Sequence, residues 1–356
     1  MQPLELGPNQ PKQFYRGGAA IAAFRGTANP DEFRPEDWVG SATSRFGAEE
    51  AGLSQLPDGT LLRDAIAANP ERWLGPEHAA YFGASPALLV KLLDAGERLP
   101  VHAHPSRSFA LRHLGSRHGK TEAWVVLGTS GAEPSVYLGW ARDVEASELS
   151  RWVAQQDSRA MLSNLHKLQV APGDAVLVPA GTPHAIGEGV FCLELQEPTD
   201  FSVMLELAGF GLSPSEGELG LGRDLALSCV SRRALSQDCL DELLRRKALP
   251  QRGPENDARA RVTDLLPAAA APYFRAEVVV PGSGEATLRP SFSVLVVNTG
   301  AGVLFGEGWE VPLRAGATWV VPWDAGETSV RGEVQLLRCL PPLPDRAAQD
   351  EPSPAS

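Results

Sequence analysis

The chain has 356 residues, of which 43% are hydrophobic and 21% charged, a balance typical of a folded protein with a large core. Its formal net charge of −12 argues against a nucleic-acid partner, because binding to phosphates requires a basic surface. No apolar stretch reaches the roughly 20 residues that a membrane-spanning helix needs, so we expect no membrane partner.

The cysteines and the N-terminus bear on the compartment. The chain has four cysteines, which form no Cys-x-x-Cys pair: Cys192, Cys229, Cys239 and Cys339. So few thiols in so long a chain are typical of a reducing compartment and argue against a zinc site made of thiolates. The first residues lack the basic head and apolar run of a signal peptide. We therefore expect a cytoplasmic protein, and the sequence does not indicate its oligomeric state.

Thirty-five glycines and thirty prolines predict the many turns of an all-β fold. The N-terminal part is expected to contain two strands and two short helices, at 18–24, 38–41, 64–68 and 71–74. The apolar run 88–93 predicts a buried strand. Trp38 either lines a pocket or belongs to the core, and Lys91 either extends towards water or has a functional role.

Two histidines follow in the sequence PVHAHP. If residues 101–104 form a strand, His102 and His104 point to the same face, because strand side chains alternate with period two. The sequence GKTEAW comes next, and by the same alternation Glu122 and Trp124 share one face of the following apolar run.

A third histidine, His184, follows the expected strand 175–178 through the turn sequence PAGTP. Two histidines, a glutamate and this third histidine, all projecting into one barrel lumen, would bind a divalent cation. Imidazole nitrogens and one carboxylate suit zinc in particular, with a position left open for water or substrate. The sequence therefore predicts a metal site formed by His102, His104, Glu122 and His184.

The same half of the chain contains further expected strands and helices. The strands lie at 124–127, 135–138, 190–196 and 202–207, and the helices at 143–165, 223–231 and 238–247. In the strand 190–196, Cys192, Glu194 and Gln196 share one face. Because this strand follows directly on the His184 loop, we expect these side chains to face the lumen rather than solvent.

Changes in composition divide the chain into an N-terminal metal-binding unit, a linker, a second all-β unit and a tail, at 1–247, 248–269, 270–340 and 341–356. Helical insertions in the first unit are expected at about 141–167 and 222–247. The sequence AGATWVVP of the second unit weakly repeats APGDAVLVP of the first, but the second unit contains no histidine and is expected to bind no metal. The tail, rich in proline, serine and acidic residues, is expected to be disordered.

Four short sequences carry a resemblance to a known family: HAHP, GKTE, PAGTPHA and ELQ. In order and spacing they resemble the type I mannose-6-phosphate isomerases, zinc enzymes of the cupin superfamily. The resemblance implies a mainly β fold of tandem cupin (jelly-roll) barrels with a helical insert. It also implies a metal-dependent aldose–ketose isomerase that interconverts mannose 6-phosphate and fructose 6-phosphate through an enediol. Its partner would be a small sugar or sugar phosphate.

The resemblance assigns the ligands of one zinc ion per chain. The family's ligands, in order Gln, His, Glu and His, fall on His102, His104, Glu122 and His184. His102 stands where the family most often has glutamine. Imidazole is the stronger zinc ligand, so we expect metal binding to survive this change or to tighten.

The resemblance also suggests which residues meet the sugar. Lys91 and Lys120 match two family lysines near the sugar, and Glu194 matches an acidic residue of the family site. We expect Lys91, Trp38 and Trp124 to bind substrate, and Lys120 and Glu194 to be catalytic. Either Glu194 or Lys120 is the proton shuttle, and the alternative role for Glu194 is to orient a metal-bound histidine.

Two departures from the family concern the phosphate. Pro100 stands where the family often has a serine that helps to hold phosphate, and Met204 where many members have an arginine. Losing a hydroxyl and a cation weakens phosphate recognition, and Arg45, Arg107 and Arg112 are the candidates to compensate. One alternative is therefore the same chemistry on an unphosphorylated or different sugar. An alternative of another class is a sugar-binding cupin without catalytic activity.

Overall fold

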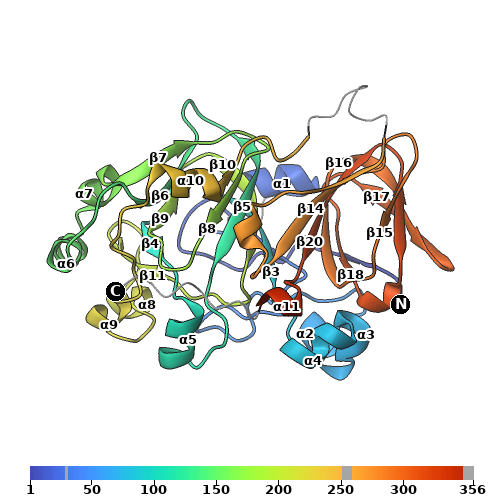
Figure 1. Ribbon diagram of the computed structural model, residues 1–356, viewed down its shortest axis with the longest axis horizontal. Coiled ribbons are helices and arrows are strands. Elements are labelled where there is room, and N and C mark those ends of the chain that lie inside the picture. Colours follow the sequence, from blue (N-terminus) through green and yellow to red (C-terminus); the bar gives the residue numbers. More distant parts are fainter. Residues whose placement is uncertain (29–30, 251–258, 348–356) are drawn as a thin grey trace.

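A computed structural model describes residues 1–28, 31–250 and 259–347. In this part of the chain, antiparallel strands dominate and form three sheets, of nine, six and five strands (Figure 1). Each sheet keeps open edges among the described residues, so none closes into a ring of hydrogen-bonded strands. The prediction of a mainly β fold is confirmed.

The six-stranded sheet carries one wall of the candidate site. Its strands run in the order β12 (Leu244–Arg245), β8 (Ala175–Val178), β5 (Glu122–Thr129), β10 (Val190–Gln196), β3 (Leu89–Asp94) and β2 (Glu36–Val39). β3, β8 and β10 contain no exposed residue, which fits their nearly continuous apolar sequences, since both faces of the sheet are covered. In register, Glu194 on β10 faces Trp124 on β5 and Lys91 on β3.

The five-stranded sheet carries the opposite wall. Its strands run in the order β11 (Val203–Met204), β4 (His102–Ala103), β9 (His184–Ile186), β6 (Ser135–Trp140) and β7 (Leu165–Gln169). His102 and His184 are direct partners in register between β4 and β9. Two histidines that lie 82 positions apart in the sequence are thereby fixed side by side by backbone pairing.

The nine-stranded sheet belongs mainly to the C-terminal part of the chain. It contains β1 (Leu4–Leu6), β18 (Thr318–Val321), β16 (Ser293–Gly306), β20 (Val334–Leu340), β14 (Arg275–Val280), β13 (Arg261–Asp264), β15 (Glu285–Leu288), β17 (Trp309–Arg314) and β19 (Thr328–Arg331).

Two strands of this sheet differ from the expected boundaries. β1 pairs with β18, so the N-terminus joins the second sheet system rather than the unit expected for 1–247. β13 pairs with β14 although it lies in the segment 248–269 that the composition suggested as a linker. Residues 251–258 of that segment lie outside the described residues.

The segment 18–24, expected to be a strand, is the helix α1 (Ala19–Arg25), and the expectation was wrong. The sequence is mostly alanine, which has the highest helix propensity. The carboxylate of Asp94 accepts hydrogen bonds from the backbone N–H groups of Gly18 and Ala20 at the start of the helix. This cap comes from a residue far along the sequence, so no local pattern announced it.

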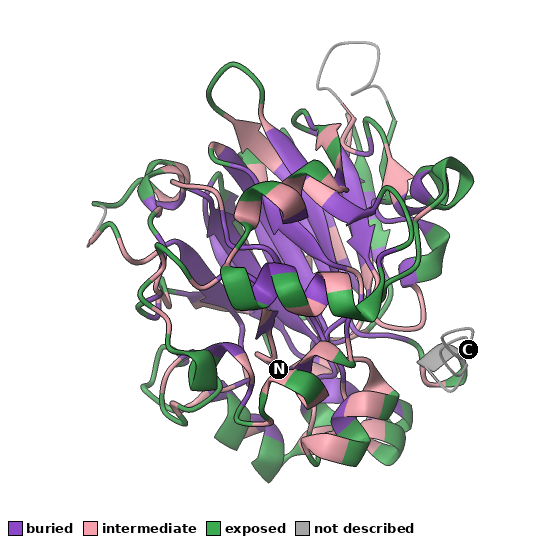
Figure 2. Ribbon diagram, turned by 90° about the vertical axis from the view of Figure 1, so that its left-hand side faces the viewer, coloured by how far each residue is buried: buried purple, intermediate pink, exposed green. Residues whose placement is uncertain are grey.

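The other helices lie around the strands: α2 (Leu62–Ala68), α3 (Pro70–Leu74), α4 (Pro76–Phe82), α5 (Arg107–His113), α6 (Ala146–Gln155), α7 (Ser158–Ser163), α8 (Pro214–Gly217), α9 (Arg223–Leu227), α10 (Gln237–Leu243) and α11 (Pro344–Ala347). In Figure 2 they present exposed faces outside a largely buried set of strands. None of the helices in the described ranges has the length and apolar character needed to cross a bilayer.

Several expected elements differ in detail. The helix expected at 143–165 is split into α6 and α7, because Gln156 between them adopts a left-handed backbone with φ 53°. The helix expected at 238–247 ends at Leu243, and the chain continues as strand β12. Part of the tail expected to be disordered forms α11, while 348–356 lie outside the described residues.

Candidate metal site and active site

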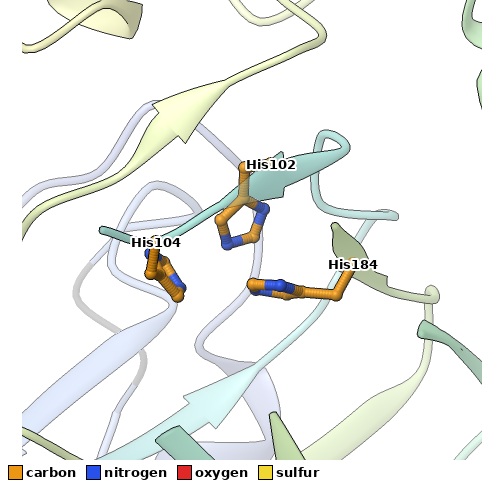
Figure 3. A group of neighbouring side chains, drawn as sticks. All are labelled: His102, His104 and His184. Carbon is orange, nitrogen blue, oxygen red and sulfur yellow. The ribbon is translucent and has the colours of Figure 1, made fainter. Parts of the chain in front are cut away.

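Three histidines meet between the two smaller sheets. They are His102, His104 and His184, and all three are buried. Each ring offers one nitrogen as a metal ligand, and these three nitrogens lie within 4.8 Å of one another. His102 and His184 are register partners with ring centroids 4.1 Å apart, and His104, two residues after His102, lies 4.9 Å and 4.8 Å from these rings. Figure 3 shows the three rings facing one another.

Backbone carbonyls orient each ring. The Nδ1 atoms of His102, His104 and His184 lie 2.8 Å from the carbonyl oxygens of Pro100, Phe201 and Thr182, respectively. A carbonyl only accepts, so each Nδ1 carries a proton, and in a neutral ring Nε2 then keeps its lone pair. Burial lowers the pKa of His102 well below its usual value, and burial followed by the Lys120 charge lowers that of His104 to about 3. These two imidazoles are neutral, the form that binds a metal.

Glu122 reaches the histidines from the opposite sheet, where it begins β5. Its Oε2 lies 2.9 Å from Nε2 of His104 and its Oε1 lies 3.3 Å from Nε2 of His184. Burial alone would raise the pKa of Glu122, but the charge of Lys120, followed by His104, holds it well below its usual range. The carboxylate is therefore ionised at neutral pH.

This donor set fits a zinc ion. Nε2 of His184 is buried and, among the described residues, has no hydrogen-bond partner of good geometry, which is unusual for a buried polar atom. Three imidazole nitrogens and one carboxylate are the ligands that zinc prefers. A cation held by His102, His104, Glu122 and His184 would satisfy that nitrogen.

Lys120 lies beside these four residues. Its Nζ donates a hydrogen bond of 2.7 Å to Oε2 of Glu122 and lies 2.8 Å from Nε2 of His104. Its own backbone N–H is bonded to Pro105, which fixes the loop that carries it. The ammonium group of Lys120 is thus buried next to Glu122 and His104, two of the residues that would hold the metal.

Glu194 lies on the same wall as Glu122 and is buried. Its Oε1 accepts a hydrogen bond of 3.2 Å from Nε1 of Trp124, and its Oε2 lies 3.5 Å from Nζ of Lys91. Burial and then the charge of Glu122 raise the pKa of Glu194 to about 7, against the opposing effect of Lys91. A carboxyl group in this range is both a base and an acid near neutral pH.

Lys91 does not extend towards water. Its Nζ is buried, lies 3.2 Å from Oε2 of Glu36, and sits 4.6 Å from the centre of the Trp38 ring. Burial alone would lower the pKa of Lys91, but the carboxylates of Glu36 and Glu194 raise it above its ordinary value. The lysine is a fixed cation that joins two carboxylates.

Glu36 is a site residue that the sequence analysis missed. Beyond Lys91, it accepts hydrogen bonds from the hydroxyl of Tyr15 at 2.6 Å, from Nε1 of Trp38 at 2.7 Å and from Nε2 of Gln13 at 3.0 Å. Its place two residues before Trp38 on one strand was a usable signal, because residues at that spacing share a face.

Several of these groups border one cavity of about 500 Å³, whereas His104 and His184 are not among its lining residues in the described part of the chain. Its buried end is lined by His102, Lys120, Glu122 and Glu194, together with Lys91 and Glu36. Its other end is lined by exposed segments, 46–47 and 215–216. The volume lies within the usual range for a small-molecule site.

Trp38 and Trp124, which we expected to bind substrate, do not line this cavity. Neither Trp38 nor Trp124 is among the residues that border the cavity within the described ranges, and both are fully buried. Trp38 packs against Lys91, and Trp124 donates to Glu194. The expectation that the two rings contact substrate directly finds no support in the lining, which favours the core alternative for Trp38.

Sequence comparisons give relatives that cover up to 90% of this chain. No family model matches it. Mannose-6-phosphate isomerase ManA of Bacillus subtilis (strain 168) is 26% identical over 328 residues, which cover 90% of this chain and 93% of the relative. The mannose-6-phosphate isomerase of Streptococcus mutans is 34% identical over 203 residues, which cover 56% of this chain and 58% of the relative. The chain is thus similar to mannose-6-phosphate isomerases over nine tenths of its length.

Solved structures of mannose-6-phosphate isomerases share the fold. The crystal structure of the Bacillus subtilis enzyme matches with a TM-score of 0.70 at 21% identity, covering 95% of this chain and 99% of that chain. A mannose 6-phosphate isomerase bound with zinc and yttrium matches with a TM-score of 0.68 at 17% identity, covering 96% and 100%. The predicted fold class is thus confirmed across nearly the whole chain.

Pro100 and Met204, the two residues at which the resemblance led us to expect weaker phosphate recognition, both border the cavity. Of the three arginines considered as compensation, Arg45 also lines it. Arg107 instead donates a hydrogen bond of 2.6 Å to Glu197, and Arg112 is exposed on α5, outside the cavity.

Proposed function

We propose that this protein is a metal-dependent aldose–ketose isomerase that interconverts mannose 6-phosphate and fructose 6-phosphate through an enediol. The observation that carries the proposal is the cluster of three buried imidazoles with Glu122, beside a cavity lined by His102, Glu122, Lys120 and Glu194. The names of its relatives support the choice of substrate.

We propose one zinc ion per chain as the cofactor, held by His102, His104, Glu122 and His184. The zinc-bound family member supports this choice of metal. When bound, zinc supplies a Lewis acid that polarises the sugar carbonyl and stabilises the negative charge that develops on its oxygens.

The carboxyl group of Glu194 is our candidate for the proton shuttle. Isomerisation of the aldose removes a proton from C2 and returns one to C1, so the shuttle must act first as a base and then as an acid. The pKa of Glu194, raised to about 7 by burial and then by Glu122, suits both roles. Lys120 is the alternative base; in its charged form it would stabilise the oxygens of the enediol instead.

Three other residues support this chemistry. Lys91 lines the cavity and is our candidate for a hydrogen-bond donor to a sugar hydroxyl. Trp38 and Trp124 act indirectly in this scheme, since they hold Lys91 and Glu194 in place. The alternative in which Glu194 orients a metal-bound histidine lacks a supporting contact, because the three Nδ1 atoms are bonded to backbone carbonyls.

A coupled enzymatic assay tests the proposal. The purified protein is given mannose 6-phosphate or free mannose, before and after treatment with a chelator, and again after zinc is returned. We expect turnover of mannose 6-phosphate that chelation abolishes and zinc restores. Absence of hexose turnover by the zinc-loaded protein would contradict the proposal and leave a non-catalytic sugar-binding protein.

A second candidate is the same chemistry on an unphosphorylated sugar. It is favoured by Pro100 and Met204, which border the cavity without charge or hydroxyl where family members hold phosphate. In the same assay, free mannose turned over at least as fast as its phosphate would establish this candidate.

We further propose that the protein works in the cytoplasm on a small sugar phosphate, without a nucleic-acid or membrane partner. All four cysteines are free thiols, and Cys192 and Cys339 are buried, which supports a reducing compartment. The net charge of −12 opposes binding to nucleic acids and to anionic membranes.

A further inference from the structure

The exposed end of the cavity contains a cation that the proposed chemistry does not use. We propose that Arg45 binds the phosphate group of the sugar and thereby determines the preference for a phosphorylated substrate. This inference rests on the proposed function and names the residue that would set its specificity.

Arg45 differs from the other two cations that line the cavity in the described part of the chain. Nζ of Lys91 lies within 3.5 Å of both Glu36 and Glu194, and Nζ of Lys120 donates to Glu122 at 2.7 Å. The charge of each lysine is thus already balanced. Arg45 forms no ion pair with any described carboxylate.

One carboxylate faces Arg45 across the mouth of the cavity. Glu216 lies near enough for the arginine charge to contribute to lowering its pKa, after the larger effect of its hydrogen bonds to Ser213. Those bonds, 2.6 Å from the Ser213 hydroxyl and 2.9 Å from its backbone N–H, tie Glu216 into the cap of α8. Glu216 therefore lies near Arg45 but forms no ion pair with it, because its carboxylate is engaged by Ser213.

The backbone around Arg45 is fixed before any ligand binds. Its N–H donates to the carbonyl of Ala51 at 2.8 Å, and its own carbonyl accepts from Ala48 at 3.0 Å. The next residue, Phe46, donates its N–H to the Asp200 carboxylate at 3.2 Å. An arginine on an ordered loop loses less entropy when it binds an anion than one on a mobile loop.

The guanidinium group is itself oriented but not saturated. Its Nη1 donates to the backbone carbonyl of Lys12 at 2.8 Å, and the planar group has further donors beyond this bond. A guanidinium fork matches the oxygens of a phosphate, and bonds between these charged groups are stronger than neutral ones. Arg45 therefore has the charge and the free donors that Pro100 and Met204 lack.

The position of Arg45 matches the shape of the substrate. C1 and C2 of a hexose 6-phosphate are at one end of the molecule, and the phosphate is at the other. If C1 and C2 reach the buried end with the histidines, the phosphate points towards the exposed end, where the neighbours of Arg45, residues 46–47, line the mouth.

Substitution of Arg45 tests the inference. Arg45→Gln keeps an amide donor for the Lys12 carbonyl but removes the charge, and Arg45→Lys keeps the charge but loses the fork. The matched control is Arg112→Gln, on the exposed face of α5. For each variant, kcat and KM are measured with mannose 6-phosphate and with free mannose, together with inhibition by inorganic phosphate and zinc content.

We expect Arg45→Gln to lower kcat/KM for mannose 6-phosphate by about 10- to 100-fold, mainly through KM, and to weaken phosphate inhibition. Turnover of free mannose and the zinc content should stay near wild type, Arg45→Lys should recover part of the loss, and Arg112→Gln should change nothing. An unchanged ratio between the two substrates in Arg45→Gln would overturn the inference while leaving the proposed function intact. Failure of the wild-type protein to prefer the phosphate would overturn both.

Discussion

At the scale of single residues, the ionisation of Glu194 is controlled by neighbouring charges. Burial and then Glu122 raise its pKa to about 7, whereas the ammonium group of Lys91, 3.5 Å away, lowers it. A base must be deprotonated, so kcat/KM should rise with pH through a limb at or below about 7, since a bound dication would lower the value further. Replacing Lys91 by methionine should move that limb to higher pH by about one unit or more.

The phosphate of the substrate also titrates, but it is the same in every assay. Comparing the pH profile of Lys91→Met with that of wild type therefore cancels its contribution. Lys167→Met is a matched control, because Lys167 is an exposed lysine that pairs with Glu133 away from the cavity. A pH profile of Lys91→Met that coincides with that of wild type would rule out Glu194 as the titrating base.

His102 is the proposed metal ligand at which the chain departs from the pattern expected from the family resemblance. One of its ring nitrogens lies within 4.8 Å of a candidate ligand nitrogen of each of the other two rings, and its Nδ1 lies 2.8 Å from the carbonyl oxygen of Pro100. His102→Ala should reduce zinc retention strongly, because one of four ligands is lost. Elemental analysis after dialysis measures this, and zinc content equal to that of wild type would remove His102 from the ligand set.

The sequence was informative for the cluster of three histidines and Glu122, because these residues occur in short sequences that are characteristic of a known family. It was less informative for Glu36, whose role depends on contacts with Lys91 and Tyr15 from separate parts of the chain. Asp200 and Arg45 stand on loops, where no periodicity exists to show which way a side chain points.

At the scale of elements, the loop before β5 determines the position of Lys120 and Glu122. A Cβ added at Gly119 would lie 2.6 Å from the carbonyl oxygen of Pro105 and 2.7 Å from the backbone nitrogen of Arg107. Backbone atoms cannot swing aside, so Gly119→Ala should displace the loop. We expect kcat to fall by about 10- to 100-fold, since catalysis is sensitive to shifts of this size.

Gly128, within β5, is the matched control for this substitution. Its added Cβ would meet Phe191 at 3.6 Å, an ordinary contact, so Gly128→Ala should retain activity. Equal activity of the two variants would show that the loop before β5 tolerates displacement and that its packing does not position Lys120.

Strands whose side chains alternate regularly between two faces were predictable from sequence. For example, β10 has the expected bounds of 190–196. Elements defined by distant partners were not predictable. The capping of α1 by Asp94 and the pairing of β1 with β18 each depend on residues remote in sequence. Local propensity cannot reveal such contacts.

At the scale of the whole molecule, we propose that the chain is organised as two β units joined by one continuous core. Buried apolar residues of the six-stranded sheet, such as Leu193, form a single cluster with residues of the nine-stranded sheet, such as Leu337. The N-terminal strand β1 crosses from the first unit to the second. Because of this shared core, the described parts should unfold together.

Metal removal tests the coupling between the site and this fold. A ligand present at 100 times its Kd stabilises the folded state by about 2.7 kcal/mol, so zinc should raise Tm by several degrees over the chelated protein. Calorimetry or circular dichroism measures the shift, and His102→Ala should show little of it. Equal Tm values with and without zinc in the wild-type protein would indicate that the three histidines and Glu122 do not bind the ion together.

The central claim is that one zinc ion, bound between the two smaller sheets, makes this chain an isomerase. The most direct test is to titrate zinc into the metal-free protein while the conversion of mannose 6-phosphate to fructose 6-phosphate is followed. We predict no turnover without metal and a linear rise in rate that reaches its plateau at one zinc per chain. Full turnover by the metal-free protein, or none after the site is filled, would contradict the claim.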